Sequence, residues 1–103
     1  MWIMLNNSFL SIVENRNNKN ELLVRARIKG DIEKVFSDVK TFEDKTADYK
    51  YRAFIPRNLV EKVVASKIAS INYFNFKGSV SSHDKERHDV YLRIWSEMHK
   101  VQK

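Results

Sequence analysis

The sequence contains no cysteine. Without thiols the chain has no disulfide bond, no thiolate zinc site and no cysteine nucleophile. Glycine is almost as scarce: Gly30 and Gly78 are the only two, so no glycine-rich loop is available to hold a phosphate group. The single proline, Pro56, cannot donate to a β-ladder and is expected to end a strand.

Long apolar runs are also absent. The segment from Met1 to Leu5 is apolar but carries no basic residue, and Asn6 and Asn7 interrupt it. A secretory signal needs ~7–15 apolar residues in a row, and a membrane-spanning helix needs ~20. The sequence therefore predicts a cytoplasmic protein without a membrane partner.

The chain is short and basic. Its 103 residues, 43% of them hydrophobic, predict a single domain over residues 1–103 with a real core. A domain of this size buries a limited share of its surface, so a homodimer would be a natural supplement to its stability. The net charge of +6 favours a polyanionic partner such as nucleic acid, an acidic protein surface or anionic lipid; solubility alone is the alternative.

Four segments have the short apolar or alternating patterns of strands: residues 2–5, 9–14, 21–28 and 49–55. The first two lie on either side of a turn-forming Asn-Asn-Ser cluster and predict a β-hairpin. The last two alternate between apolar and polar residues, as half-buried strands do. A short extended piece is also expected around residues 41–43.

Three segments predict helices. Asp31 is suited to cap the first, Asn58 with Glu61 resembles a capping box for the second, and Ser81 with Ser82 is suited to cap the third. Together these elements predict an α+β fold. We expect a small, mostly antiparallel sheet of three to five strands with two or three helices packed on one face, and a ferredoxin-like variant is a common layout of such elements.

Two of the expected strands carry the positive charge. Residues 15–30 have a net charge of +4 and residues 45–57 a net charge of +3. In each strand the cations share one face, together with Leu23 and Phe54, and the remaining apolar residues share the other. If both strands join one sheet, its open face gathers a candidate polyanion-binding site: Arg25, Arg27, Lys50, Arg52 and Phe54.

Such a face suits single-stranded nucleic acid, because cations follow the phosphates and aromatic rings stack on the bases. Trp2 and Met4 of the hairpin would add to it, whereas Tyr49 and Tyr51 have the opposite parity and are expected in the core. An acidic protein would fit equally well, since clustered like charges are costly without a partner. The remaining alternative is a sheet face kept soluble by arginine and lysine.

Catalytic chemistry has a weaker basis. His83 and His88 are five residues apart, so they do not share a helix face as a zinc pair would, and no metal ligands are assigned. The leading hypothesis is a non-enzymatic binding protein with no catalytic residues and no cofactor. The alternative is a small hydrolase or RNase-type toxin in which His83 or His88 works with a carboxylate.

Aromatic residues recur in the C-terminal part of the sequence. Residues 72–77 form a loop whose aromatic side chains are expected in the core. The last helix carries an apolar stripe that includes Tyr91, Trp95 and Met98, spaced as one helix face. This stripe is expected to be core, with a dimer seam as the alternative.

Read together, several segments resemble a family of small, uncharacterised bacterial proteins of about this length, for which a phage or mobile-element origin is one alternative. The segments that carry the resemblance span nearly the whole chain: Met1-Trp2, residues 7–13, residues 23–27, residues 48–52, Ile55-Pro56-Arg57, Asn75-Phe76-Lys77, and Tyr91 with Trp95 and Met98. The resemblance implies a compact bacterial-type protein and brings no established activity and no catalytic residues. In a phage or mobile-element setting, the binding hypothesis predicts a regulator or inhibitor of nucleic-acid-handling machinery.

Overall fold

The computed structural model describes residues 1–103 and has an α+β fold with a five-stranded sheet and four α-helices, which confirms the predicted fold class. The elements are β1 (Trp2–Leu5), β2 (Ser8–Glu14), β3 (Glu21–Ala26), α1 (Asp31–Val35), β4 (Phe42–Glu43), β5 (Tyr51–Pro56), α2 (Arg57–Ala69), α3 (Phe76–Ser79), α4 (Lys85–Met98) and a final 3-10 turn, His99–Val101. None of the helices has the length and apolar character needed to span a membrane.

The contacts within the chain group its residues into two compact units, Met1–Ile71 and Asn72–Lys103. The first unit contains the whole sheet with α1 and α2, and the second contains α3 and α4. The single domain expected from the chain length stays a prediction.

The sheet of the first unit has the strand order β1-β2-β3-β5-β4, and every neighbouring pair is antiparallel. A ferredoxin-like layout instead has the element order βαββαβ, with a helix between the first and second strands and another between the third and fourth. In this chain β1, β2 and β3 follow one another with no helix between them. That variant is therefore wrong for this chain. The reason is local: a two-residue turn joins β1 to β2, and β4 adds to the outer edge of β5.

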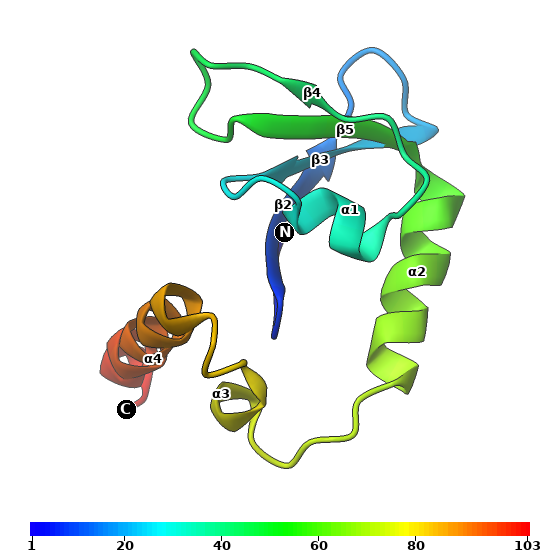
Figure 1. Ribbon diagram of the computed structural model, residues 1–103. Coiled ribbons are helices and arrows are strands. Elements are labelled where there is room, and N and C mark those ends of the chain that lie inside the picture. The colour runs from blue at the N-terminus through cyan, green and yellow to red at the C-terminus, as the bar shows by residue number, and fades with distance from the viewer. The chain divides into compact units, whose positions relative to one another are not determined.

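The core lies on one face of this sheet, where α1 and α2 both pack (Figure 1). The predicted alternation holds within β3 and β5, where it places Val24, Ala26, Ala53 and Ile55 on this face. Ile28 was expected there too, but it lies beyond the end of β3 and is 49% exposed. The buried core residues are Leu10, Ile12, Val24, Ala26, Ile32, Val35, Phe36, Ala53, Ile55 and Val60.

The opposite face of the sheet is covered by no helix of the first unit. We call it the open face, and the register of the strands assigns its members by parity. These are Trp2, Met4, Phe9, Ser11, Val13, Leu23, Arg25, Phe42, Arg52 and Phe54. Trp2 and Met4 thus have the parity expected for them.

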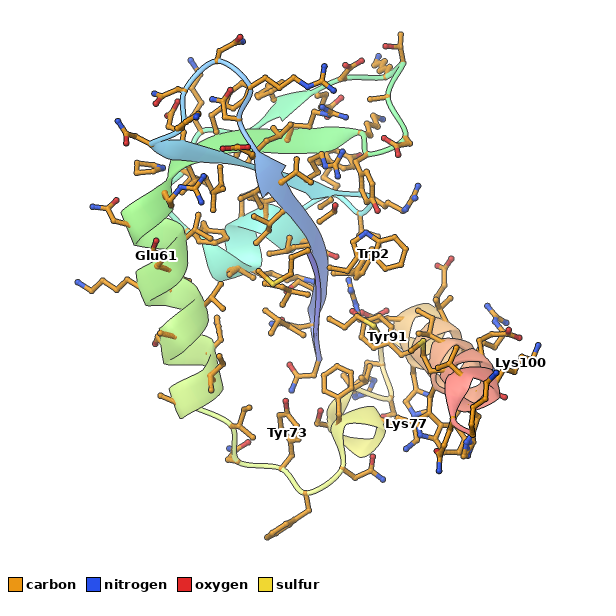
Figure 2. The ribbon with its side chains drawn as sticks, turned by 180° about the vertical axis from the view of Figure 1, so that it is seen from behind. Trp2, Glu61, Tyr73, Lys77, Tyr91 and Lys100 are labelled. Atoms are coloured by element: carbon orange, nitrogen blue, oxygen red, sulfur yellow. The ribbon has the colours of Figure 1, made fainter.

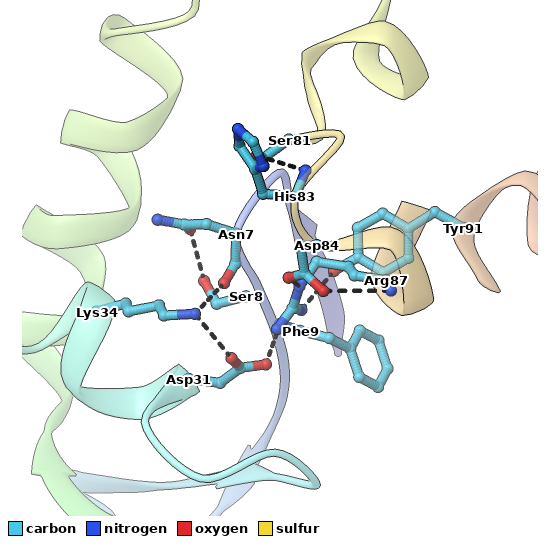
Figure 3. A network of polar contacts seen from close by, with 10 residues as sticks. All are labelled: Asn7, Ser8, Phe9, Asp31, Lys34, Ser81, His83, Asp84, Arg87 and Tyr91. Atoms are coloured by element: carbon cyan, nitrogen blue, oxygen red, sulfur yellow. Dashed lines mark hydrogen bonds and ion pairs between the residues drawn. The ribbon is translucent and has the colours of Figure 1, made fainter. Parts of the chain in front are cut away.

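Asp31 does not cap α1 with its side chain, contrary to expectation. Gly30 precedes the helix with a left-handed φ of +93°, and Asp31 is the first helical residue. Its Oδ2 instead accepts a hydrogen bond of 3.0 Å from the main-chain N–H of Phe9 (Figure 3). Lys34 Nζ adds to this link, donating to the Asn7 carbonyl at 3.1 Å and lying 3.7 Å from Asp31 Oδ1. These contacts fasten α1 to the β1–β2 hairpin.

The predicted cap of α2 is also wrong. Pro56 ends β5 with φ of −51° and ψ of 134°, and the helix begins at the next residue. Asn58 therefore lies inside the first turn, and no side chain caps this helix. Proline is compatible with a helix start, because it has no N–H to satisfy.

In the second unit the helix starts are capped by residues other than those expected. Asn75 accepts a hydrogen bond from the Gly78 N–H and begins α3. Asp84, not Ser81 or Ser82, accepts one from the Arg87 N–H and begins α4. Aspartate and serine are equally favourable N-cap residues, so composition alone does not distinguish Asp84 from Ser81 or Ser82 as the cap of α4.

The aromatic loop and the last helix are only partly buried, and the prediction that the loop aromatics are core residues is wrong for Phe74, which is fully exposed. Phe76 stacks on Tyr91 with ring centroids 5.8 Å apart, and Tyr73 contacts Phe76. Trp95 and Met98 are exposed, so the prediction that they are core residues is wrong. Within this unit, the four-residue helix α3 is the only helical partner of α4, and it is too short to cover the whole stripe.

Replacing Gly30 with alanine is expected to lower the free energy of unfolding by about 1 kcal/mol, because its φ is left-handed. An added methyl group meets no atom within 4 Å, so the backbone conformation alone causes the loss. Urea denaturation followed by circular dichroism measures it. Gly78→Ala is the matched control: Gly78 lies in α3 without a left-handed φ, and stability should stay constant or rise. Equal losses in both variants would contradict this account.

Candidate polyanion-binding face

Arg25 of β3 and Arg52 of β5 are direct cross-strand partners on the open face. On the neighbouring strands, Ser11 of β2 lies opposite Arg25, and Phe42 of β4 lies opposite Arg52. Neighbouring strands are about 4.8 Å apart, so the two arginines leave adjacent positions. Like charges in such positions repel, and the structure must offset that cost.

Tyr49 supplies part of the offset. The guanidinium carbon of Arg25 lies 4.6 Å from the centroid of the Tyr49 ring, and that of Arg27 lies 4.3 Å from it. A cation over an aromatic face is attracted by the negative charge density of the ring. Tyr49 is buried, as expected, yet its ring meets the arginines of the open face.

Hydrogen bonds fix the direction of each arginine. Arg25 Nη2 donates to Ser11 Oγ at 2.7 Å, and Arg27 Nη1 donates to the Asp48 carbonyl at 2.9 Å. Arg52 Nε donates to the Tyr49 carbonyl at 3.0 Å. The three side chains are therefore tied to the sheet and to the segment just before β5.

The charge of this arginine group is only partly balanced. Arg52 Nη2 lies 3.9 Å from Asp48 Oδ1, and the Asp48 side chain is mostly exposed. An exposed pair at this distance contributes little to stability. In addition, Arg25 Nε is buried without a hydrogen-bond partner. A buried donor left unpaired is costly, so the group is not arranged for stability alone.

An aromatic pair adjoins the arginines. The rings of Phe42 and Phe54 stack with centroids 5.5 Å apart and planes 30° apart. Phe54 is 47% exposed and Phe42 is 40% exposed. Phe54 is one of the site residues expected from the sequence, whereas Phe42 is not. Phe42 reaches this face only because β4 pairs with β5, which places Phe42 opposite Arg52.

Lys50 is placed differently from the arginines. It precedes β5, and its Nζ lies 5.5 Å from the ring centroid of Tyr51, a residue of the core-facing parity. Its carbonyl accepts a hydrogen bond of 2.8 Å from the Asp44 N–H. The structure thus brings together Arg25, Arg27, Arg52 and Phe54, while Lys50 belongs to the loop beside them.

The histidines of the alternative hydrolase site do not form a cluster. In the second unit, Arg87 Nε donates to Asp84 Oδ2 at 2.8 Å and Arg87 Nη1 donates to the Tyr91 hydroxyl at 3.1 Å (Figure 3). His83 contributes only its main-chain N–H, to Ser81 Oγ, and His88 Nδ1 lies 3.7 Å from Asp89. No group of three or more residues is placed to hold a metal ion.

The loop between β4 and β5 contains a carboxylate with a shifted pKa. Thr46 Oγ1 donates to Asp44 Oδ1 at 2.7 Å, and the Thr46 N–H donates to it at 3.0 Å. These bonds hold the pKa of Asp44 below its usual range, and the charge of Arg52 acts in the same direction. Asp44 therefore stays ionised beside the arginine group.

Thr46→Val removes the hydroxyl, so the pKa of Asp44 should rise toward the ordinary value of an aspartate. Because the pKa of Asp44 is lowered in the folded state, its ionised carboxylate stabilises the folded loop at pH values above the ordinary pKa of an aspartate. This stabilisation is lost as the pH falls through the lowered pKa. NMR titration of the Asp44 side chain measures the shift. Thr46→Ser keeps the hydroxyl and should leave the pKa low; a rise in both variants would contradict the hydrogen-bond explanation.

Comparison with known proteins gives no family assignment. Neither protein-family models nor curated proteins nor solved structures match the chain significantly. What the open face does must therefore be inferred from its own residues.

Proposed function

We propose that the open face of the sheet binds single-stranded nucleic acid and that the protein acts as a non-enzymatic binding module. The observation that carries this proposal is the cross-strand pair Arg25 and Arg52 beside the exposed, stacked rings of Phe42 and Phe54. Cations for phosphates and rings for bases are the two elements that such a ligand requires.

The arginines support phosphate binding through their fixed direction. A guanidinium group binds a phosphate with two parallel hydrogen bonds, and less entropy is lost when the fork is already oriented. Arg25 and Arg52 are each held by one hydrogen bond. Their terminal Nη–H groups that are not used in these bonds are the donors that we assign to phosphate oxygens, whereas the buried Arg25 Nε is not one of them.

The aromatic pair favours nucleic acid over an acidic protein. Acidic side chains would be satisfied by the arginines, and they have no need of a flat ring surface. Phe54 and Phe42 are each at least 40% exposed, although burying them would be favourable. A base stacked on these rings would cover that apolar surface. An acidic protein partner is the second candidate, because its carboxylates would also neutralise the positive charge of the arginine group.

In cellular terms, we place the protein in the cytoplasm. We further propose a role as a small phage or mobile-element regulator or inhibitor of nucleic-acid-handling machinery. Binding of a single strand by a basic, aromatic sheet face would give such a regulator direct access to an exposed strand.

Arg25→Ala/Arg52→Ala is expected to weaken binding of a single-stranded oligonucleotide at low salt. It should also reduce the slope of log K against log salt by about 1.4, because each lost phosphate contact contributes about 0.7 for a single strand. Fluorescence anisotropy at several salt concentrations measures both. The control Lys62→Ala/Lys67→Ala removes two charges from α2 and should leave the slope nearly unchanged. No binding by the wild type at low salt, or equal binding by the arginine variant, would exclude nucleic acid.

Phe54→Ala tests stacking separately from charge. Loss of one stacked base costs about 1–3 kcal/mol, so affinity should fall by roughly 5- to 150-fold while the salt slope stays constant. Leu59→Ala removes a partly exposed apolar side chain from α2 and serves as the control. An unchanged affinity for Phe54→Ala, combined with a loss for the arginine variant, would favour an acidic protein partner instead.

A further inference from the structure

Strand β1 leaves hydrogen-bonding groups unpaired at one edge of the sheet. The N–H of Ile12 donates to the Met1 carbonyl at 2.8 Å, so Met1 and Ile12 form a hydrogen-bonded pair. In an antiparallel ladder such pairs alternate along the strand. Ile3 therefore bonds to β2 through Leu10, while the N–H and C=O groups of Trp2 and Met4 point away from β2.

The two edges of the sheet differ in their protection. The outer edge is β4, which has only two residues and adjoins the charged residues Asp44 and Lys45. Short length and charge are common devices against edge-to-edge pairing. β1 contains no charged residue, no proline and no bulge. Its Trp2 side chain is labelled in Figure 2. Trp2 is 72% exposed. Within the first unit, β1 is therefore the edge that remains available for another strand.

We propose that β1 pairs with β1 of a second copy of this chain, forming a twofold-symmetric dimer with a continuous ten-stranded sheet. The free groups of β1 are self-complementary. If the twofold axis passes beside Ile3, Trp2 lies opposite Met4 of the partner subunit, and Met4 lies opposite Trp2 of the partner subunit. The N–H and C=O groups of Trp2 and Met4, two of each in every copy, then form four hydrogen bonds between the copies.

The side chains suit this register as well. Trp2 and Met4 share the open face, so each Trp2 ring would lie beside the thioether of the partner's Met4, a favourable contact. Trp2 also contacts Phe9 of its own chain, with ring centroids 5.9 Å apart. The two Ile3 side chains would meet on the core side, where β-branched residues pack closely across a non-hydrogen-bonded pair.

The symmetry determines what the dimer presents. A twofold axis perpendicular to the sheet keeps both open faces on the same side of the joined sheet. The arginine groups of the two copies would therefore face the same way. This inference goes beyond the proposed nucleic-acid binding and does not depend on it, because it rests on the backbone of β1 alone.

The direct test is amide hydrogen exchange in the full chain, measured by NMR at increasing protein concentration. The Trp2 and Met4 amides should become more protected as concentration rises, whereas the Ile3 amide, bonded within the sheet, should be protected throughout. Sedimentation should show a dimer in the same range, up to about 1 mM. Exchange at Trp2 and Met4 that does not depend on concentration would overturn the proposal.

A pair of matched variants tests the register. Trp2→Lys/Met4→Lys brings like charges together twice across the axis and should weaken dimerisation about tenfold or more. Trp2→Lys/Met4→Glu changes the same two positions but brings opposite charges together, so it should dimerise more strongly than the first variant. Circular dichroism verifies that both are folded. Equal dimerisation by the two folded variants would overturn the pairing of Trp2 with the partner's Met4.

Discussion

The contact between Tyr49 and two arginines is the interaction on which the open face depends. Arg25 belongs to β3 and Arg27 follows it, whereas Tyr49 precedes β5, so the ring joins two neighbouring parts of the sheet. The Tyr49 carbonyl also accepts a hydrogen bond from Arg52. One residue thereby holds three guanidinium groups within a small area and offsets part of their mutual repulsion.

The sequence predicts the sheet well because alternation is a local property. Parity along residues 21–28 and 49–55 separates the core residues from Arg25, Arg52 and Phe54 without knowledge of the partner strand. Strand register is not local, so the direct pairing of Arg25 with Arg52 and the stacking of Phe42 on Phe54 could not be predicted. Tyr49 and Lys50 lie outside β5, where the parity rule does not apply.

Helix existence was predicted better than helix detail. All three expected helices are present, but each begins at a neighbouring residue, because glycine, proline and aspartate compete with the predicted caps. The apolar stripe of α4 was assigned to the core from its spacing. Spacing shows which residues share a face, but not whether another element is available to cover it. Here Trp95 contacts the Lys77 ammonium and the His99 ring and remains half exposed.

The short length of β4 has a further consequence for the mobility of the aromatic pair. Two residues, Phe42 and Glu43, pair with β5, whereas the inner strands are held on both sides. Segments with few main-chain hydrogen bonds open locally at a much lower free-energy cost than central strands do. Phe42 therefore belongs to the most easily detached strand of the sheet, while Phe54 is anchored in β5. We therefore expect Phe42 to separate from Phe54 at a lower free-energy cost than is needed to open the core.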